Sequence, residues 1–192
     1  MHKGRVEAFT DGVIAVIITI MVLELKAPHA PSLDALAELW PVFLSYVLSF
    51  VYVGIYWNNH HHMFSVIERV DGRVMWANLH LLFWLSLLPF TTAWISENHF
   101  AAVPTAVYGA VLLLAAIAWQ PLKYALIACN GGPDCVLAQA FGRDRKGKLS
   151  VVGYLVGIAL TAVEPRIACL VYYAVALIWL LPDRRIEKVR TA

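Results

Sequence analysis

Two ionisable side chains stand at the start of the first apolar stretch of the chain. Arg5 and Asp11 flank Phe9 and Thr10, and the apolar run that follows contains one polar residue, Thr19. Charged side chains are costly at the mouth of a helix in lipid, so by default they mark a candidate functional site. The sequence therefore directs attention to this segment before any other.

Read at helical spacing, the segment presents one continuous stripe of side chains. The stripe is aliphatic apart from its charged first residue, one aromatic ring, one hydroxyl and one bare glycine. A helix surrounded by uniform lipid needs neither the hydroxyl nor the glycine. The simplest structural interpretation is helix packing, with Thr19 bonded to a carbonyl of its preceding turn. The stripe consists of Arg5, Phe9, Gly12, Val16, Thr19 and Leu23.

The two charges have simple structural interpretations of their own. Arg5 suits a membrane-interface anchor, and a carboxylate such as Asp11 near a helix N-terminus is favoured by the helix dipole. The two residues do not share a helix face, which argues against a direct pair within the helix. We therefore expect each of them to reach another helix, and the polar candidates there are Trp57, His60, His61 and Asn78.

The run His60–His62 raises the question of a metal site. Consecutive helical residues point about 100° apart, so the three imidazoles cannot bind one ion together. Residue 64, one turn after His60, is Phe, and the sequence has no H-E-x-x-H motif. We expect no metal here. A membrane enzyme using these histidines with Asn78 and His80 stays an alternative, but no nucleophile with an adjacent base accompanies them.

Composition sets the class of protein. Of the 192 residues 60% are hydrophobic and only 15% are charged, whereas soluble domains carry roughly 45–50% and about 25%. The chain is thus expected to be an all-α integral membrane protein without a cleaved signal peptide. The small net charge of +2 gives no reason to expect nucleic-acid binding. Cys129, Cys135 and Cys169 are expected to be free thiols.

The apolar pattern predicts one domain of six transmembrane helices over residues 1–192. The last two helices are short for a span of about 20 residues, and one re-entrant pair is the alternative. Pro89 and Pro121 predict kinks or helix ends, Ser32 is a candidate N-cap, and residues 143–148 are expected to form a solvated basic loop. The expected helices are 5–25, 40–64, 74–94, 101–128, 149–163 and 167–181.

The placement of basic residues predicts the orientation. With six crossings, the N-terminus, two of the loops and the C-terminus share one side of the membrane. That side holds 13 of the 15 lysines and arginines, all but Lys26 and Arg166. By the positive-inside rule both termini are cytoplasmic.

The motif Arg5-x-x-x-Phe9-Thr10-Asp11 resembles the R-x-x-x-F-S-D signature of the transmembrane protein 175 family, the lysosomal potassium channels and their bacterial relatives. Thr10 stands where Ser is usual. Further similarities are Trp57-x-x-His60-His61 and Asn78-Leu79. The length and the single copy of the motif resemble the bacterial members.

The resemblance implies that the first helix lines a pore, with Val16, Thr19 and Leu23 facing the axis. Apolar rings can gate by dewetting, and a ring of hydroxyls can replace part of an ion's water shell. The sequence has no carbonyl filter of the T-V-G-Y-G type. The expectation is therefore a modest preference for potassium over sodium. Val16 is smaller than the usual Ile or Leu, which implies a looser constriction.

The resemblance further implies a homotetramer around an axial pore, because one such subunit cannot enclose an ion path. The expected protein is a passive potassium-permeable channel of the bacterial inner membrane, in contact with lipid and monovalent cations, with no catalytic residue and no cofactor. A secondary transporter is the main alternative, although no internal repeat is evident. The residues expected to brace the pore are Arg5, Phe9, Thr10, Asp11, Trp57, His60, His61 and Asn78.

Overall fold

The computed structural model describes residues 2–142 and 144–180, and this part of the chain consists of helices joined by turns and loops. Four segments are long enough and apolar enough to cross a membrane: α1, α3, α4 together with α5, and α6. Helix α8 has 16 residues and is shorter, and α9 is described over 16 residues. In chain order the elements are α1 Lys3–Leu23, α2 Leu33–Ala37, α3 Trp40–Ser65, α4 Gly72–Ser86, α5 Leu88–Glu97, α6 Ala102–Cys129, η1 Gly132–Asp134, α7 Val136–Phe141, α8 Arg145–Leu160 and α9 Pro165–Leu180.

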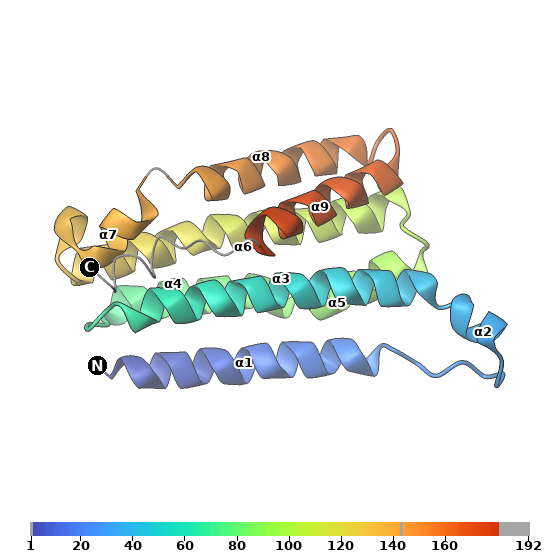
Figure 1. Cartoon of the computed structure of the whole chain (residues 1–192), viewed down its shortest axis with the longest axis horizontal. Helices are drawn as coiled ribbons and strands as arrows, with labels where there is room; N and C mark the ends of the chain where they lie inside the picture. The colour runs from blue at the N-terminus through green and yellow to red at the C-terminus, as the bar shows by residue number, and fades with distance from the viewer. Residues whose placement is uncertain (1, 143, 181–192) are drawn as a thin grey trace.

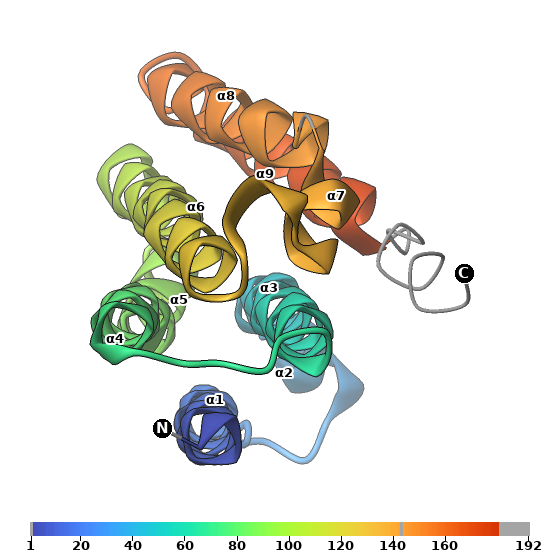
Figure 2. The same cartoon turned by 90° about the vertical axis from the view of Figure 1, so that its left-hand side faces the viewer.

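The long helices lie side by side, and α1 occupies one edge of the bundle (Figures 1 and 2). Helix α1 packs on α3, α4 and α5, whereas α8 packs on α6 and α9 at the opposite side. The most deeply buried side chains belong to the helices in between and include Val53, Val74, Leu112 and Leu122. The bundle therefore supports α1 from one side only.

The third predicted helix is in fact two. Helix α4 ends at Ser86 and α5 begins at Leu88, with Pro89 in the first turn of α5. A proline at this position lacks an N–H that the first turn would leave unbonded anyway. Helix α6, in contrast, does not end at Pro121 but continues to Cys129.

The prediction of a solvated loop before the fifth helix is wrong for residues 145–148, which form the first turn of α8. Asp144 explains the early start, because its Oδ1 accepts a hydrogen bond from the Gly147 amide at 3.2 Å. Its Oδ2 accepts a bond from Lys123 Nζ on α6 at 2.6 Å. A local cap and a distant cation thus order a segment that looks like a loop. The predicted N-cap Ser32 does cap α2, through a bond from the Ala35 amide.

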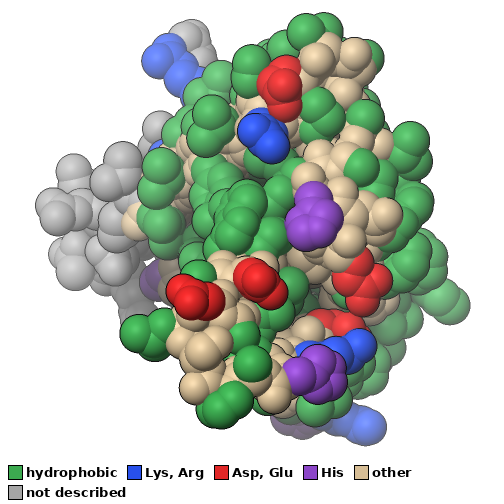
Figure 3. Space-filling model, turned by 90° about the vertical axis from the view of Figure 1, so that its right-hand side faces the viewer, with side chains coloured by type: hydrophobic (Ala, Val, Ile, Leu, Met, Phe, Trp, Pro, Cys, Tyr) green, Lys and Arg blue, Asp and Glu red, His purple; other side chains and the backbone are tan. Residues whose placement is uncertain are grey.

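The two ends of the bundle differ in charge. The N-terminus, the α3–α4 turn and α7 lie at one end, and α2 with the α5–α6 and α8–α9 turns lies at the other (Figure 1). Acidic, basic and histidine side chains are scattered over this second end (Figure 3). Its only described basic residues are Lys26 and Arg166, against Glu24, Asp34, Glu38, Glu97 and Glu164. Parts of the predictions above lie outside the described residues. These are the last residue of the sixth predicted helix, residue 181, and two sets of basic residues used for the orientation, Arg143 and those in 184–190.

Candidate functional site

A chain of buried hydrogen bonds joins α1 to the two helices behind it. Thr10, only 1% exposed, accepts a hydrogen bond at Oγ1 from Asn78 Nδ2 at 2.9 Å. Asn78 Oδ1 in turn lies 3.0 Å from Nε2 of the buried His60. One amide therefore connects α1, α3 and α4 at the level of the motif. Because all three side chains are removed from solvent, each depends on the others for its hydrogen bonds.

A second link lies at the surface beside the first. Trp57 Nε1 on α3 donates a hydrogen bond to Asp11 Oδ1 on α1 at 2.9 Å. The ring of His61 stacks on Trp57 with centroids 6.1 Å apart. The structure thus brings together five of the predicted bracing residues around α1, and His61 joins them only through Trp57.

Arg5 takes no part in either link. Its side chain is exposed, and no ion pair to it is seen in residues 2–142 and 144–180. Together with Phe9, Asn78 and Leu79 it lines a hollow of about 600 Å³ between α1 and α4. The hollow lies beside the exposed stripe of α1.

The predicted stripe faces away from the bundle. Val16 is 54% exposed and Leu23 is 75% exposed, and Thr19 is exposed between them. A Cβ placed on Gly12 would meet no atom within 4 Å. The opposite face of α1 is buried through Ile14, Ile17 and Met21. Helix α1 is therefore apolar on both faces, and only one of them is covered by this chain.

Thr19 has a definite hydroxyl orientation. Its Oγ1 donates a hydrogen bond to the Val16 carbonyl oxygen at 2.8 Å, as the packing interpretation predicts. The hydroxyl hydrogen is used within the helix, so the oxygen lone pairs remain as acceptors on the exposed face. Such an oxygen can coordinate a cation but is poorly placed to donate to an anion.

The three consecutive histidines do not converge. His60 turns inward and stacks on Phe64 with ring centroids 4.1 Å apart, while His61 turns outward to Trp57. Among the described residues no group of three or more His, Cys, Asp or Glu side chains is arranged to hold a metal ion. The cysteines of the described segments are free thiols.

Sequence reasoning missed Lys3, which fastens the start of α1. Its Nζ donates hydrogen bonds to the carbonyl oxygens of Phe64 at 3.2 Å and Ile67 at 2.9 Å. The end of α3 leaves carbonyls unbonded, and a lysine can satisfy them. Both carbonyl partners of Lys3 are more than 60 residues away in the chain. The only signal in the sequence was a general one: Lys3 lies in the first turn of α1, where the helix dipole does not favour a cation.

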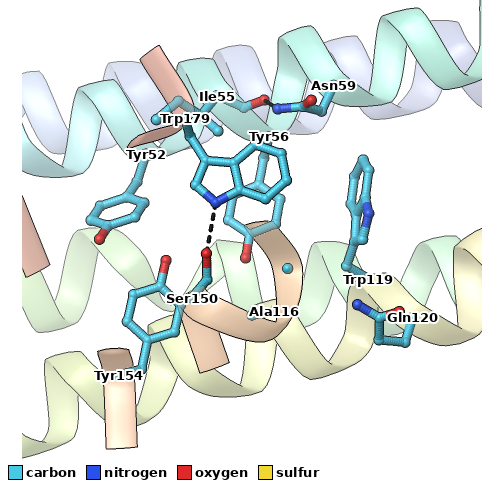
Figure 4. Close-up of a pocket in the computed structure, with 11 residues that line it drawn as sticks. Tyr52, Ile55, Tyr56, Asn59, Ala116, Trp119, Gln120, Ser150, Tyr154 and Trp179 are labelled. Atoms are coloured by element: carbon cyan, nitrogen blue, oxygen red, sulfur yellow. Dashed lines mark hydrogen bonds between the residues drawn. The ribbon is translucent and has the colours of Figure 1, made fainter. Parts of the chain in front are cut away.

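A separate small cavity lies between α3, α6, α8 and α9, on the far side from α1 (Figure 4). Its volume is about 40 Å³, which is room for one or two water molecules. Trp179 Nε1 on α9 donates to Ser150 Oγ on α8 at 2.7 Å across this wall. The cavity is lined mainly by the aromatic rings of Tyr52, Tyr56, Trp119, Tyr154 and Trp179.

Together these features define an integral membrane protein of packed helices, with a braced first helix whose outer face is left uncovered. The family described as endosomal/lysosomal potassium channel TMEM175 matches residues 5–89. A protein named potassium channel in Chryseobacterium sp. (strain P1-3) is 53% identical over 98% of this chain and 97% of its own length. The chain belongs to the TMEM175 family, a family of ion channels and not of enzymes. The resemblance predicted from the Arg5–Asp11 motif is confirmed.

The fold agrees with this assignment. The crystal structure of a lysosomal potassium-selective channel TMEM175 homolog from Chamaesiphon minutus superposes with a TM-score of 0.82 at 30% identity. The match covers 94% of this chain and 97% of that one. A chicken protein named endosomal/lysosomal proton channel TMEM175 is 31% identical over half of this chain but only 22% of its own length.

Proposed function

We propose that this chain forms a potassium-permeable channel in a bacterial inner membrane, with passive conduction and a weak preference for potassium over sodium. The observation that carries the proposal is the uncovered stripe of α1: two apolar residues, Val16 and Leu23, exposed on either side of an oriented hydroxyl. Two relatives named potassium channel, which match 98% and 94% of this chain, support the choice of ion.

The pore is built by four copies. A single α1 stripe cannot surround an ion, whereas closed rotational symmetry places the same stripe around one axis. The stripe also carries a hydroxyl and a bare glycine, which a surface that faces only lipid does not need. In the ring, the hollow beside Arg5 and Phe9 receives the neighbouring subunit.

The narrow part is formed by rings of Val16, Thr19 and Leu23. The two apolar rings exclude water when the pore is tight, and the threonine ring offers hydroxyl oxygens to a cation that has lost part of its hydration. Because only side chains face the axis, discrimination between potassium and sodium is weak. No resident cofactor is required, since the permeant ion is the only cargo.

Six crossings place both termini in the cytoplasm. The described basic residues gather at the end that carries the N-terminus and α7, in line with the positive-inside rule. In this arrangement α8 and α9 form the fifth and sixth crossings. The cytoplasmic half of α1 is held by the hydrogen-bonded residues Thr10, Asp11, Trp57, His60 and Asn78. Arg5 and Phe9 face the neighbouring subunit.

The test is ion flux in liposomes that contain the purified protein. Wild type should carry an electrogenic potassium flux. Thr19→Val removes the hydroxyl and keeps the side-chain shape, so the potassium-to-sodium ratio should fall. Leu23→Ala should raise the flux of both ions by widening an apolar ring. Asp11→Ala should lower the flux by releasing Trp57 and loosening α1.

The matched control is Leu155→Ala, which shortens an exposed apolar side chain on α8, far from α1. It should conduct like wild type. Absence of flux from folded wild-type protein across a range of voltage and pH would contradict the proposal. Saturable flux coupled to a counter-ion would instead identify a secondary transporter.

A further inference from the structure

Helices α6, α7 and α8 meet at the end of the bundle that also carries the N-terminus (Figures 1 and 2). A groove lies on the surface between them. It measures about 930 Å³. Its walls combine apolar and aromatic side chains with two lysines, and the residues that matter below are Lys123, Tyr124, Ile127, Phe141, Lys148 and Val152. The groove lies away from the α1 stripe, and it shares Gln120 and Gly147 with the lining of the small aromatic cavity.

The apolar wall of the groove is open to the surroundings. Tyr124 is 62% exposed, and Val152 is exposed on the facing helix. Since α8 packs on α6 and α9 and not on α1, this wall lies on the side of the bundle away from the proposed axis. In the ring proposed above it therefore borders lipid, at the depth where the helices reach the membrane surface. An exposed tyrosine is typical of that interface.

The charge of the groove is positive at its polar end. Asp144 is the one carboxylate on its described wall, and its charge is offset by Lys123 Nζ at 2.6 Å and by the Gly147 amide at 3.2 Å. Lys148 and Arg145 are exposed, and in the described residues neither has an ion-pair partner. Both lie in the first turn of α8, where a cation is opposed by the helix dipole. An anion at the N-terminal end of α8 is favoured by the charge of Lys148 and by the dipole of α8.

We propose that the groove binds an anionic phospholipid of the cytoplasmic leaflet. The phosphate group lies at Lys148 and the first turn of α8. One acyl chain runs along Ile127 and Val152, and Tyr124 borders the glycerol region. Basic pockets between membrane helices on the cytoplasmic side are suited to anionic headgroups. A zwitterionic lipid offers the same chains without the net charge, so it fits less well.

The experiment measures thermal unfolding of the full-length protein in detergent while a short-chain phosphatidylglycerol or phosphatidylcholine is titrated. Phosphatidylglycerol should raise the unfolding temperature in a saturable manner, and phosphatidylcholine should do so much more weakly. Lys148→Gln should weaken the apparent affinity for phosphatidylglycerol roughly fivefold, as expected for the loss of one cation near a membrane surface. The control Lys26→Gln removes an exposed lysine from the opposite end and should change nothing.

A second variant keeps the test independent of charge and of folding defects. Val152→Trp fills the apolar wall and leaves every charge in place, and it should also abolish most of the phosphatidylglycerol response. Equal stabilisation by the two lipids would overturn the proposal. So would an unchanged response in both Lys148→Gln and Val152→Trp, or an equal response to inorganic phosphate alone. Because no ion gradient is used, failure here is distinct from failure of the channel proposal.

Discussion

Thr10 shows how a single residue of the motif acts in this protein. The position requires a hydroxyl that accepts from Asn78, and threonine supplies it as serine would. The additional methyl group is buried with the rest of the side chain. Serine and threonine both supply the hydroxyl that Asn78 needs, and the methyl group of threonine packs in the buried surroundings.

Asn78 is the central residue of this network. Replacing it with Leu leaves His60 Nε2 and Thr10 Oγ1 buried without their present partner. The expected loss of stability is about 1–3 kcal/mol for each group left unpaired. Thermal unfolding of the purified variant in detergent measures this loss. His80→Ala, an exposed change on the same helix, should unfold near the wild-type temperature, and equal behaviour of the two variants would contradict this assignment.

Lys123 is 4% exposed and forms an ion pair with Asp144. Lys123→Met alone should lower stability by about 3 kcal/mol, because a largely buried carboxylate loses its cation. Adding Asp144→Asn should restore much of the loss. Asparagine keeps the cap on Gly147 and tolerates the left-handed backbone at this position, where φ is 41°. Thermal unfolding of the single and double variants tests this, and a double variant no more stable than the single one would refute it.

The bracing residues were predictable one by one but their pairings were not. A polar side chain in an apolar helix stands out in the sequence, and this identified Asp11, Trp57, His60 and Asn78. That His60 bonds to Asn78 while His61 stacks on Trp57 depends on helix rotation, which the sequence does not specify. Lys123 and Lys3 were missed because their partners are distant in the chain and each looks like an ordinary surface cation.

At the scale of helices, the apolar runs predicted the existence of the long elements and the proline pattern predicted breaks. The outcome at each proline differed, since Pro89 begins α5 whereas Pro121 lies within α6. A helix can continue through a proline where the neighbouring helices support it. That support depends on how the helices pack, so the local sequence cannot show that a helix begins at Pro89 but continues through Pro121.

Helices α6, α8 and α9 meet through glycines. A Cβ on Gly157 would collide with the ring of Tyr172, and one on Gly109 would collide with its hydroxyl. Gly153 and Gly157 form a G-x-x-x-G pattern, which lets membrane helices approach closely. This signal was present in the sequence and was not used.

Gly157→Ala should therefore lower the stability of the bundle by about 1–3 kcal/mol through overpacking against Tyr172. The matched control is Gly54→Ala in α3, where an added Cβ meets no atom within 4 Å. That change should be neutral or stabilising by about 0.5–1 kcal/mol, because glycine disfavours a helix interior. Thermal unfolding in detergent distinguishes the two. A Gly157→Ala variant as stable as Gly54→Ala would argue against close packing here.

At the scale of the whole molecule, the uncovered face of α1 predicts which positions on α1 can be cross-linked between subunits. In a background without Cys129, Cys135 and Cys169, Leu23→Cys should join neighbouring subunits through a short thiol reagent. Ile17→Cys should not, since Ile17 is buried against its own bundle. Denaturing gel electrophoresis shows the products, up to a species of four chains. Cross-linking at Ile17 but not at Leu23 would mean that α1 is rotated the other way in the assembly.

The dimensions of the outer helices have a consequence for the membrane itself. Helix α8, with 16 residues, measures about 24 Å at 1.5 Å per residue. The hydrocarbon core of a typical bilayer is about 30 Å thick, whereas α6 has 28 residues. In the six-crossing arrangement α8, on the rim, is thus roughly 6 Å too short for the lipid around it, whereas α6 is not. Such a hydrophobic mismatch favours thin bilayers, so acyl-chain length becomes a mechanical variable that acts on the rim of the protein and spares its axis.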